Sequence, residues 1–156
     1  RKHLVIGIID HSAEVTVEEV ANAFYGTTAI DSKTDRLCNS IILEKDLSLP
    51  CSKTKPYFTI TKGQNLCCNV TQSNVDERDP DMVTEVFEEM MELPDDTPAG
   101  SRIDITYSYD TNQRMKCEFY HPDSGARFVK TLEVTPAGTG KPGGDAKDMF
   151  DDFEIE

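Results

Sequence analysis

Alternating hydrophobic and polar positions are clearest in the second half of the chain. The stretch Ile103–Tyr109 alternates apolar with polar residues, and Met115–Phe119 and Phe128–Val134 continue the pattern after turn-rich segments. A period of two residues is typical of strands that bury one face. Three such strands with short turns predict an antiparallel meander.

The first half of the chain also favours strands. Ala29–Asp31 and Ser40–Leu43 lie on either side of a turn-forming segment, Ser32–Asp35, which predicts a hairpin. Further strands are expected at Tyr57–Thr61 and Leu66–Gln72, joined by a tight connection that contains Gly and Asn. The chain is therefore predicted to be all-β, an antiparallel β-sandwich with short turns.

One segment, Asp81–Leu93, has a different period. Its apolar residues are spaced as they are along one side of a helix: Val83, Val86, Phe87, Met90 and Met91. Pro80 and Pro94 flank the segment, and Glu and Met favour helices, so local propensity predicts an amphipathic helix. Pairing with neighbouring strands often overrides such propensity, so the residues alone leave both structures open.

The two ends differ from the body in composition. Residues 1–14 form an N-terminal extension or interdomain linker, in which Leu4–Ile9 is a short strand or an apolar linker. Residues 15–134 form the predicted sandwich. Residues 135–156 combine a Gly/Pro-rich linker with a flexible acidic tail. Apolar residues remain in that tail, which is either disordered or a short docking motif: Met149, Phe150, Phe153 and Ile155.

Negative charge is concentrated in two segments. The formal net charge is −13, of which residues 76–96 carry −9 and residues 145–156 carry −5, so the rest is close to neutral. This balance argues against binding to nucleic acid or to anionic membranes, since both need clustered Lys and Arg. The longest apolar run, Leu4–Ile9, is far too short to span a bilayer.

The residue types of common catalytic and metal sites are present without the necessary spacing. The five cysteines are Cys38, Cys51, Cys67, Cys68 and Cys117. Their number is odd and they form no Cys-x-x-Cys pair, which argues against zinc and favours buried thiols in a reducing, cytoplasmic compartment. Consecutive Asp10-His11-Ser12 cannot form a catalytic triad. We expect no metal site and no enzyme activity in this chain.

Several turns and strands follow a familiar order. Pro98-Ala99-Gly100 precedes a strand ending in Tyr107-Ser108-Tyr109-Asp110, and a further strand leads to Ser124-Gly125; upstream, Asn39–Leu43 leads to a Leu49-Pro50 corner. This arrangement resembles the β-sandwich peptide-binding subdomain of the seventy-kilodalton (DnaK-type) heat-shock chaperones. The similarity covers about Val15–Val134, although the family's helical lid is absent.

The resemblance implies a function for the fragment. It would bind unfolded, extended apolar peptides under the control of an ATPase domain outside this chain, so ATP belongs to the parent protein and no cofactor to this fragment. A J-domain co-chaperone is an implied partner. The interdomain linker would be Leu4–Asp10 or, with better spacing, Val15–Val20. The family pattern also favours a strand at Val86–Leu93.

The resemblance also implies site residues. The floor of the peptide pocket would include Thr27, Phe58, Cys68 and Val70, while Ile30 and Thr61 would arch over the peptide. Thr27 and Cys68 replace larger aliphatic residues, which implies a wider or more polar pocket. The alternative for each residue is an ordinary core or loop position.

Two further alternatives remain open. The domain could be a protein-interaction or scaffold sandwich that has lost general peptide capture, which the missing lid favours. The apolar residues of the tail could instead occupy the groove of the same or another copy, giving self-association. The acidic segments predict that acidic peptides are disfavoured and that basic flanks are tolerated.

Overall fold

The computed structural model describes residues 2–9 and 12–134, and the described chain is almost entirely β. It contains ten strands of eight residues each and one short 3-10 helix, η1. The strands are β1 (Lys2–Ile9), β2 (Ser12–Glu19), β3 (Phe24–Asp31), β4 (Arg36–Leu43), β5 (Cys51–Phe58), β6 (Leu66–Ser73), β7 (Thr84–Met91), β8 (Arg102–Tyr109), β9 (Arg114–His121) and β10 (Ala126–Glu133), and η1 is Pro80–Met82. No helix among these residues has the length and apolar character needed to cross a membrane.

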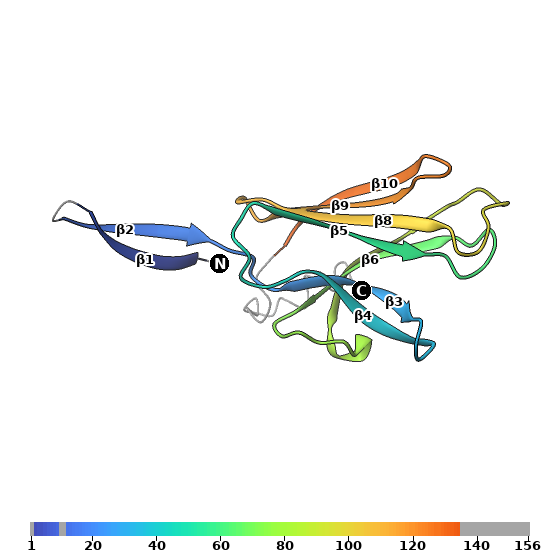
Figure 1. Cartoon of the computed structure of the whole chain (residues 1–156), viewed down its shortest axis with the longest axis horizontal. Coiled ribbons are helices and arrows are strands. Elements are labelled where there is room, and N and C mark those ends of the chain that lie inside the picture. The colour runs from blue at the N-terminus through green and yellow to red at the C-terminus, as the bar shows by residue number, and fades with distance from the viewer. Residues whose placement is uncertain (1, 10–11, 135–156) are drawn as a thin grey trace.

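Eight of the strands form two antiparallel four-stranded sheets, with strand orders β10-β9-β8-β5 and β4-β3-β6-β7. The sheets pack face to face (Figure 1), which confirms the predicted all-β sandwich. Because neighbouring strands alternate in direction, the β3–β4, β5–β6, β7–β8 and β9–β10 connections all lie at one end of the sandwich. We call this end, on the right in Figure 1, the loop end.

The core lies between the sheets and follows the predicted alternation. In β8, Ile103, Ile105, Tyr107 and Tyr109 are all buried, while the residues between them are partly exposed. Strand β9 continues the layer in the same way, and Tyr25 of β3 meets Tyr109 edge to face across the sheets, with ring centroids 5.6 Å apart. The meander predicted for residues 103–134 is therefore confirmed as β8, β9 and β10.

The helical prediction for residues 81–93 is wrong, and the strand alternative is correct. Strand β7 pairs with β6 from Leu66↔Met91 to Gln72↔Thr84. In this pairing Met91 is buried and Met90 is exposed, as expected for successive residues of a strand. Backbone hydrogen bonds to β6 outweigh the modest helix propensity of Glu and Met.

The β5–β6 connection also differs from the expectation. Strand β5 begins at Cys51, before the predicted start at Tyr57, and pairs with β8 rather than with β6. The connection between β5 and β6 therefore crosses from one sheet to the other instead of closing a hairpin. The hairpin predicted around residues 32–35 is confirmed, since β3 pairs with β4 from Tyr25 to Asp31.

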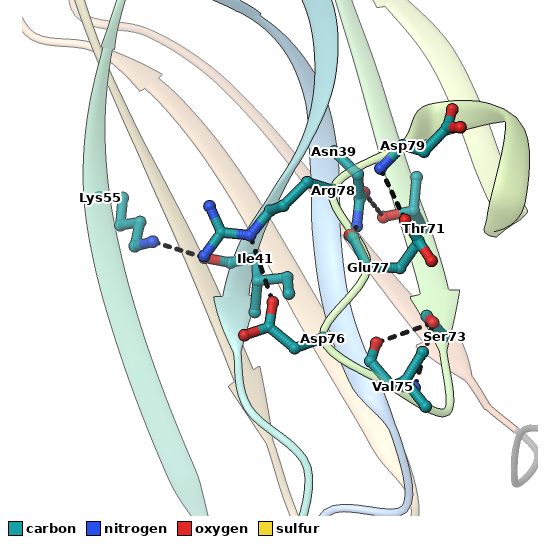
Figure 2. Close-up of polar contacts among 10 residues, drawn as sticks. All are labelled: Asn39, Ile41, Lys55, Thr71, Ser73, Val75, Asp76, Glu77, Arg78 and Asp79. Carbon is teal, nitrogen blue, oxygen red and sulfur yellow. Dashed lines mark hydrogen bonds and ion pairs between the residues drawn. The ribbon is translucent and has the colours of Figure 1, made fainter.

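The β6–β7 connection covers the edge strand β4. The backbone amide of Asn39 donates to the carbonyl of Arg78 at 2.8 Å, and its side-chain amide donates to the carbonyl of Glu77 at 2.8 Å. Thr71 of β6 donates from its hydroxyl to Asn39 Oδ1. Figure 2 shows the Asn39 side chain between Glu77 of the connection and Thr71 of β6. The loop satisfies backbone groups that an edge strand would otherwise expose.

Strands β1 and β2 form a separate two-stranded sheet that extends away from the sandwich (Figure 1). Their register runs from Lys2↔Glu19 to Ile9↔Ser12. Leu4–Ile9 is therefore part of a strand, and Val15–Val20, the favoured linker candidate, lies mostly in β2. The predicted linker and acidic tail, including Met149, Phe150, Phe153 and Ile155, lie outside the described residues.

Candidate functional site

The sheet that contains β3 and β6 divides as it approaches the loop end. These two strands form only three pairs, Phe24↔Ser73, Tyr25↔Gln72 and Gly26↔Thr71. Beyond Gly26, β3 continues to pair with β4 on its other side, and β6 continues to pair with β7. No further β3–β6 pair occurs in the described chain, so the strand edges that face each other are released from their ladder. We call this opening the fork.

The base of the fork is held from the opposite sheet by Tyr107. Its hydroxyl lies 2.8 Å from the carbonyl oxygen of Gly26 and 2.9 Å from that of Asn69. Tyr107 is fully buried, and this burial raises the pKa of its hydroxyl well above the ordinary value, so the group stays protonated. One side chain of β8 thereby joins β3 to β6 at the point where their ladder ends.

The side-chain amide of Asn69 crosses the fork just beyond this point. Its Oδ1 atom accepts from the backbone N–H of Thr28 at 3.0 Å and from the hydroxyl of Thr27 at 2.6 Å. Its Nδ2 atom donates to Thr28 Oγ1 and to Glu85 Oε2, both at 2.9 Å. The amide has two acceptor positions and two donor hydrogens, and all four are used. Asn69 is itself buried.

The six predicted site residues fall into two groups. Thr27, Cys68 and Val70 are buried in the interior between the two sheets. Burial of the Cys68 thiol raises its pKa to about 12, which makes it a poor nucleophile at neutral pH. The other three predicted residues, Ile30, Phe58 and Thr61, are exposed at the loop end.

Apolar side chains are exposed around the loop end. Ile30 and Leu37 are register partners on β3 and β4, and they are 41% and 59% exposed. Phe58 and Ile60, at the end of β5 and just beyond it, are 58% and 59% exposed. Scattered exposed apolar residues are common, but several at one end of a domain are typical of a binding surface.

The loop that carries Ile60 and Thr61 is held by hydrogen bonds. Gln64 Oε1 accepts from the backbone amides of Ile60 and Thr61 at 2.7 and 2.8 Å. The backbone of Thr59 exchanges hydrogen bonds with the β7–β8 connection, donating to Ser101 and accepting from Gly100. These contacts fix the backbone beside the exposed apolar side chains, which reduces the entropy lost on binding a ligand.

The side of the fork that carries β7 is acidic. Glu85 accepts from Asn69, and Glu88 accepts from the Cys67 thiol at 3.1 Å. Both belong to the acidic segment 76–96, which carries −9 of the formal net charge of −13. An extended ligand at the fork would meet apolar side chains near the loops and carboxylates along β7.

A shallow hollow also lies at the opposite end of the sandwich. Its lining includes hydroxyl side chains and two cations, Arg114 and Lys116. Arg114 approaches Glu133 at 3.7 Å, and the nearby Asp110 carboxylate accepts backbone N–H bonds in its own turn. Its cation Arg114 is already paired with Glu133, and the strands around it keep their pairing. This hollow is therefore a weaker candidate than the fork.

Sequence reasoning missed Asn69, Tyr107 and Glu85. Tyr107 was predicted as a core residue, which it is, but its hydroxyl contacts are made with strands about 40 and 80 positions away in the chain. Asn69 is one polar residue within the strand predicted at Leu66–Gln72, where an isolated polar residue is ordinary. No local signal marks either residue, because the fork exists only when three strands from two sheets meet.

Within the described residues, no group of three or more His, Cys, Asp and Glu side chains is arranged to hold a metal ion. No protein-family model and no curated protein sequence matches this chain.

Proposed function

We propose that this chain is the peptide-binding sandwich of a DnaK-type chaperone or a close relative, and that it binds extended apolar segments at the fork. The observation that carries the proposal is the released strand edges of β3 and β6, which lie at the same end as four exposed apolar side chains. The order of turns and strands that resembles the chaperone family supports it independently.

The chemistry of binding follows from the end of the β3–β6 ladder. An extended segment that enters the fork gains main-chain hydrogen bonds, which do not depend on its sequence. Its apolar side chains are covered by Ile30, Leu37, Phe58 and Ile60. The carboxylates of Glu85 and Glu88 disfavour acidic flanks by like-charge repulsion.

In this proposal the parent protein supplies what the fragment lacks. An ATPase domain outside the chain binds ATP and controls the affinity of the sandwich, and a J-domain protein is its co-chaperone. The fragment itself needs no cofactor and catalyses no reaction. The setting is the cytoplasm, where the five free thiols remain reduced.

A second candidate is a scaffold or interaction sandwich without general peptide capture. The burial of Thr27, Cys68 and Val70 favours this second candidate, because residues buried between the sheets offer no open pocket for a ligand side chain. Such a module would bind one folded partner through the exposed loop end. The two candidates differ in whether a short, unstructured peptide binds.

The test is titration of the full chain with a fluorescently labelled, Leu-rich extended peptide, followed by anisotropy. Phe58→Asp should weaken saturable binding at least tenfold, because it places a charge among the exposed apolar side chains of the loop end. Val129→Asp is the matched control, since Val129 is also an exposed apolar residue, 45% accessible, but lies on β10.

Saturable binding that Phe58→Asp weakens and Val129→Asp does not would support peptide capture. Absence of saturable binding by the wild-type chain would overturn it and favour the scaffold function. Equal effects of the two substitutions would place the peptide somewhere other than the fork, which also contradicts the proposal.

A further inference from the structure

The Asn69 side chain is chemically a peptide group placed inside an opening between strands. Its carbonyl oxygen accepts the Thr28 backbone N–H at 3.0 Å, as the carbonyl of a neighbouring strand would. Thr28 is the register partner of Asn39 in β4, yet its N–H points the other way, toward β6. The Thr28 N–H is the first backbone donor of β3 that faces β6 beyond the ladder, and a side chain rather than a strand accepts its hydrogen bond.

We propose that Asn69 is a latch that closes the fork in the unliganded protein and that a bound segment must displace its amide from Thr28. In the bound state, a backbone carbonyl of the ligand accepts the Thr28 N–H in place of Asn69 Oδ1. This inference rests on the proposed function and adds to it the way in which access to the site is regulated.

The contacts of the amide explain why it can both close and release the fork. On one side it is anchored to Thr27 and Thr28 of β3, and on the other to Glu85, whose side chain is exposed on the edge strand β7. Rotation of Asn69 away from β3 breaks its bonds to the two threonines. The deeper bonds of Tyr107 to Gly26 and Asn69 carbonyls do not depend on that rotation, so the base of the fork stays joined.

The inference predicts faster opening when the amide is removed. In Asn69→Ala, hydrogen exchange at the Thr28 amide and the association rate of the Leu-rich peptide should each rise about tenfold, the factor expected for one net hydrogen bond. Asn39→Ala is the matched control, because Asn39 is also a buried amide that bridges segments of the same sheet but lies on β4, on the side of β3 where pairing is continuous. Asn39→Ala should leave the association rate unchanged.

A measurement on the wild-type chain keeps the inference testable if Asn69→Ala does not fold. On saturation with the peptide, the side-chain amide protons of Asn69 should shift and exchange faster in NMR spectra, while those of Asn39 should not change. Peptide binding without any change at Asn69 would overturn the latch.

The two proposals fail in distinguishable ways. Peptide binding with association and Thr28 exchange unchanged in Asn69→Ala would overturn the latch alone and leave peptide capture standing. Absence of peptide binding by the wild type, by Asn69→Ala and by Asn39→Ala would overturn the proposed function and, with it, the latch.

Discussion

At the scale of single residues, buried polar atoms determine where strands meet and where they part. The Tyr107 hydroxyl lies within hydrogen-bond distance of two backbone carbonyl oxygens, one on β3 and one on β6. Tyr109, two residues later on the same strand, is also buried, but among the described residues its hydroxyl bonds no backbone carbonyl. Two chemically identical side chains therefore contribute differently to the fold.

Tyr107→Phe should lower the free energy of unfolding by about 1–3 kcal/mol, because it leaves two buried carbonyls without their shared donor. Tyr109→Phe removes a hydroxyl that bonds no backbone carbonyl, so its effect should be smaller. Urea denaturation of both variants measures the difference. Equal destabilisation by the two substitutions would contradict the role assigned to the Tyr107 hydroxyl.

Cys67 is an exposed thiol that the structure nevertheless makes unreactive. Partial burial of its sulfur raises its pKa to about 12, and the hydrogen bond and negative charge of Glu88 act in the same direction. The thiolate, which is the reactive form, is therefore scarce at neutral pH.

Glu88→Gln should speed alkylation of Cys67 by iodoacetamide at pH 8 by about three- to tenfold, because removing the carboxylate lowers the pKa of the thiol. Glu89→Gln makes the same change of charge at the neighbouring residue, which pairs with Cys68 instead. Peptide-resolved mass spectrometry would follow the reaction. Acceleration by both variants alike would show a general charge effect rather than the specific contact.

At the scale of elements, the fork depends on how closely β3 approaches β4. A Cβ atom at Gly26 would lie 2.3 Å from the carbonyl oxygen of Ser40, which is backbone and cannot move aside alone. The β3–β4 register also shifts between Tyr25 and Gly26. A glycine is thus required at the position where β3 leaves β6, for space rather than for an unusual backbone angle.

Gly26→Ala should destabilise the sandwich by about 3 kcal/mol, at the upper end of overpacking costs, because two paired strands must separate to admit the methyl group. Gly100→Ala is a suitable comparison. Gly100 has a positive φ of 80° but open space around it, so its substitution should cost only about 1 kcal/mol of backbone strain. Thermal unfolding of both variants would rank them, and the opposite order would be inconsistent with the close approach.

At the scale of the whole molecule, buried thiols link stability to pH. Burial raises the pKa values of Cys68 and Cys117 to about 12 in the folded protein, whereas an unfolded thiol titrates near 8.5. Below about pH 8.5 both states keep the protons, so stability is at its full value there. Above that pH only the unfolded state loses them, so stability falls as pH rises toward 12.

Between pH 8.5 and pH 10 the free energy of unfolding should therefore fall by about 2 kcal/mol for each of these thiols. In Cys117→Ala the decline with pH should be shallower by about that amount, whatever the cost of the substitution at neutral pH. Urea denaturation at several pH values would measure both slopes. Parallel slopes for the variant and the wild type would contradict the linkage.

Sequence patterns predicted elements well where one face of a strand is buried and the other is solvated. The meander of β8, β9 and β10 and the β3–β4 hairpin follow directly from alternation and turn residues. Strand β7 was ambiguous, because its Glu and Met residues favour a helix while its pairing with β6 requires a strand. The alternation pattern by itself misses the start of β5, since Cys51–Tyr57 contains Lys, Pro and Thr and shows little alternation.

The sequence by itself determined that this chain forms a β-sandwich, because periods of two residues and turn-forming segments are local properties. It also determined where the acidic charge lies. Only the tertiary structure decided that β3 and β6 part beyond Gly26, that Tyr107 and Asn69 meet there, and that Thr27, Cys68 and Val70 are enclosed. Those outcomes depend on core packing and on hydrogen bonds between residues about 40 to 80 positions apart, and such contacts leave no trace in a local pattern.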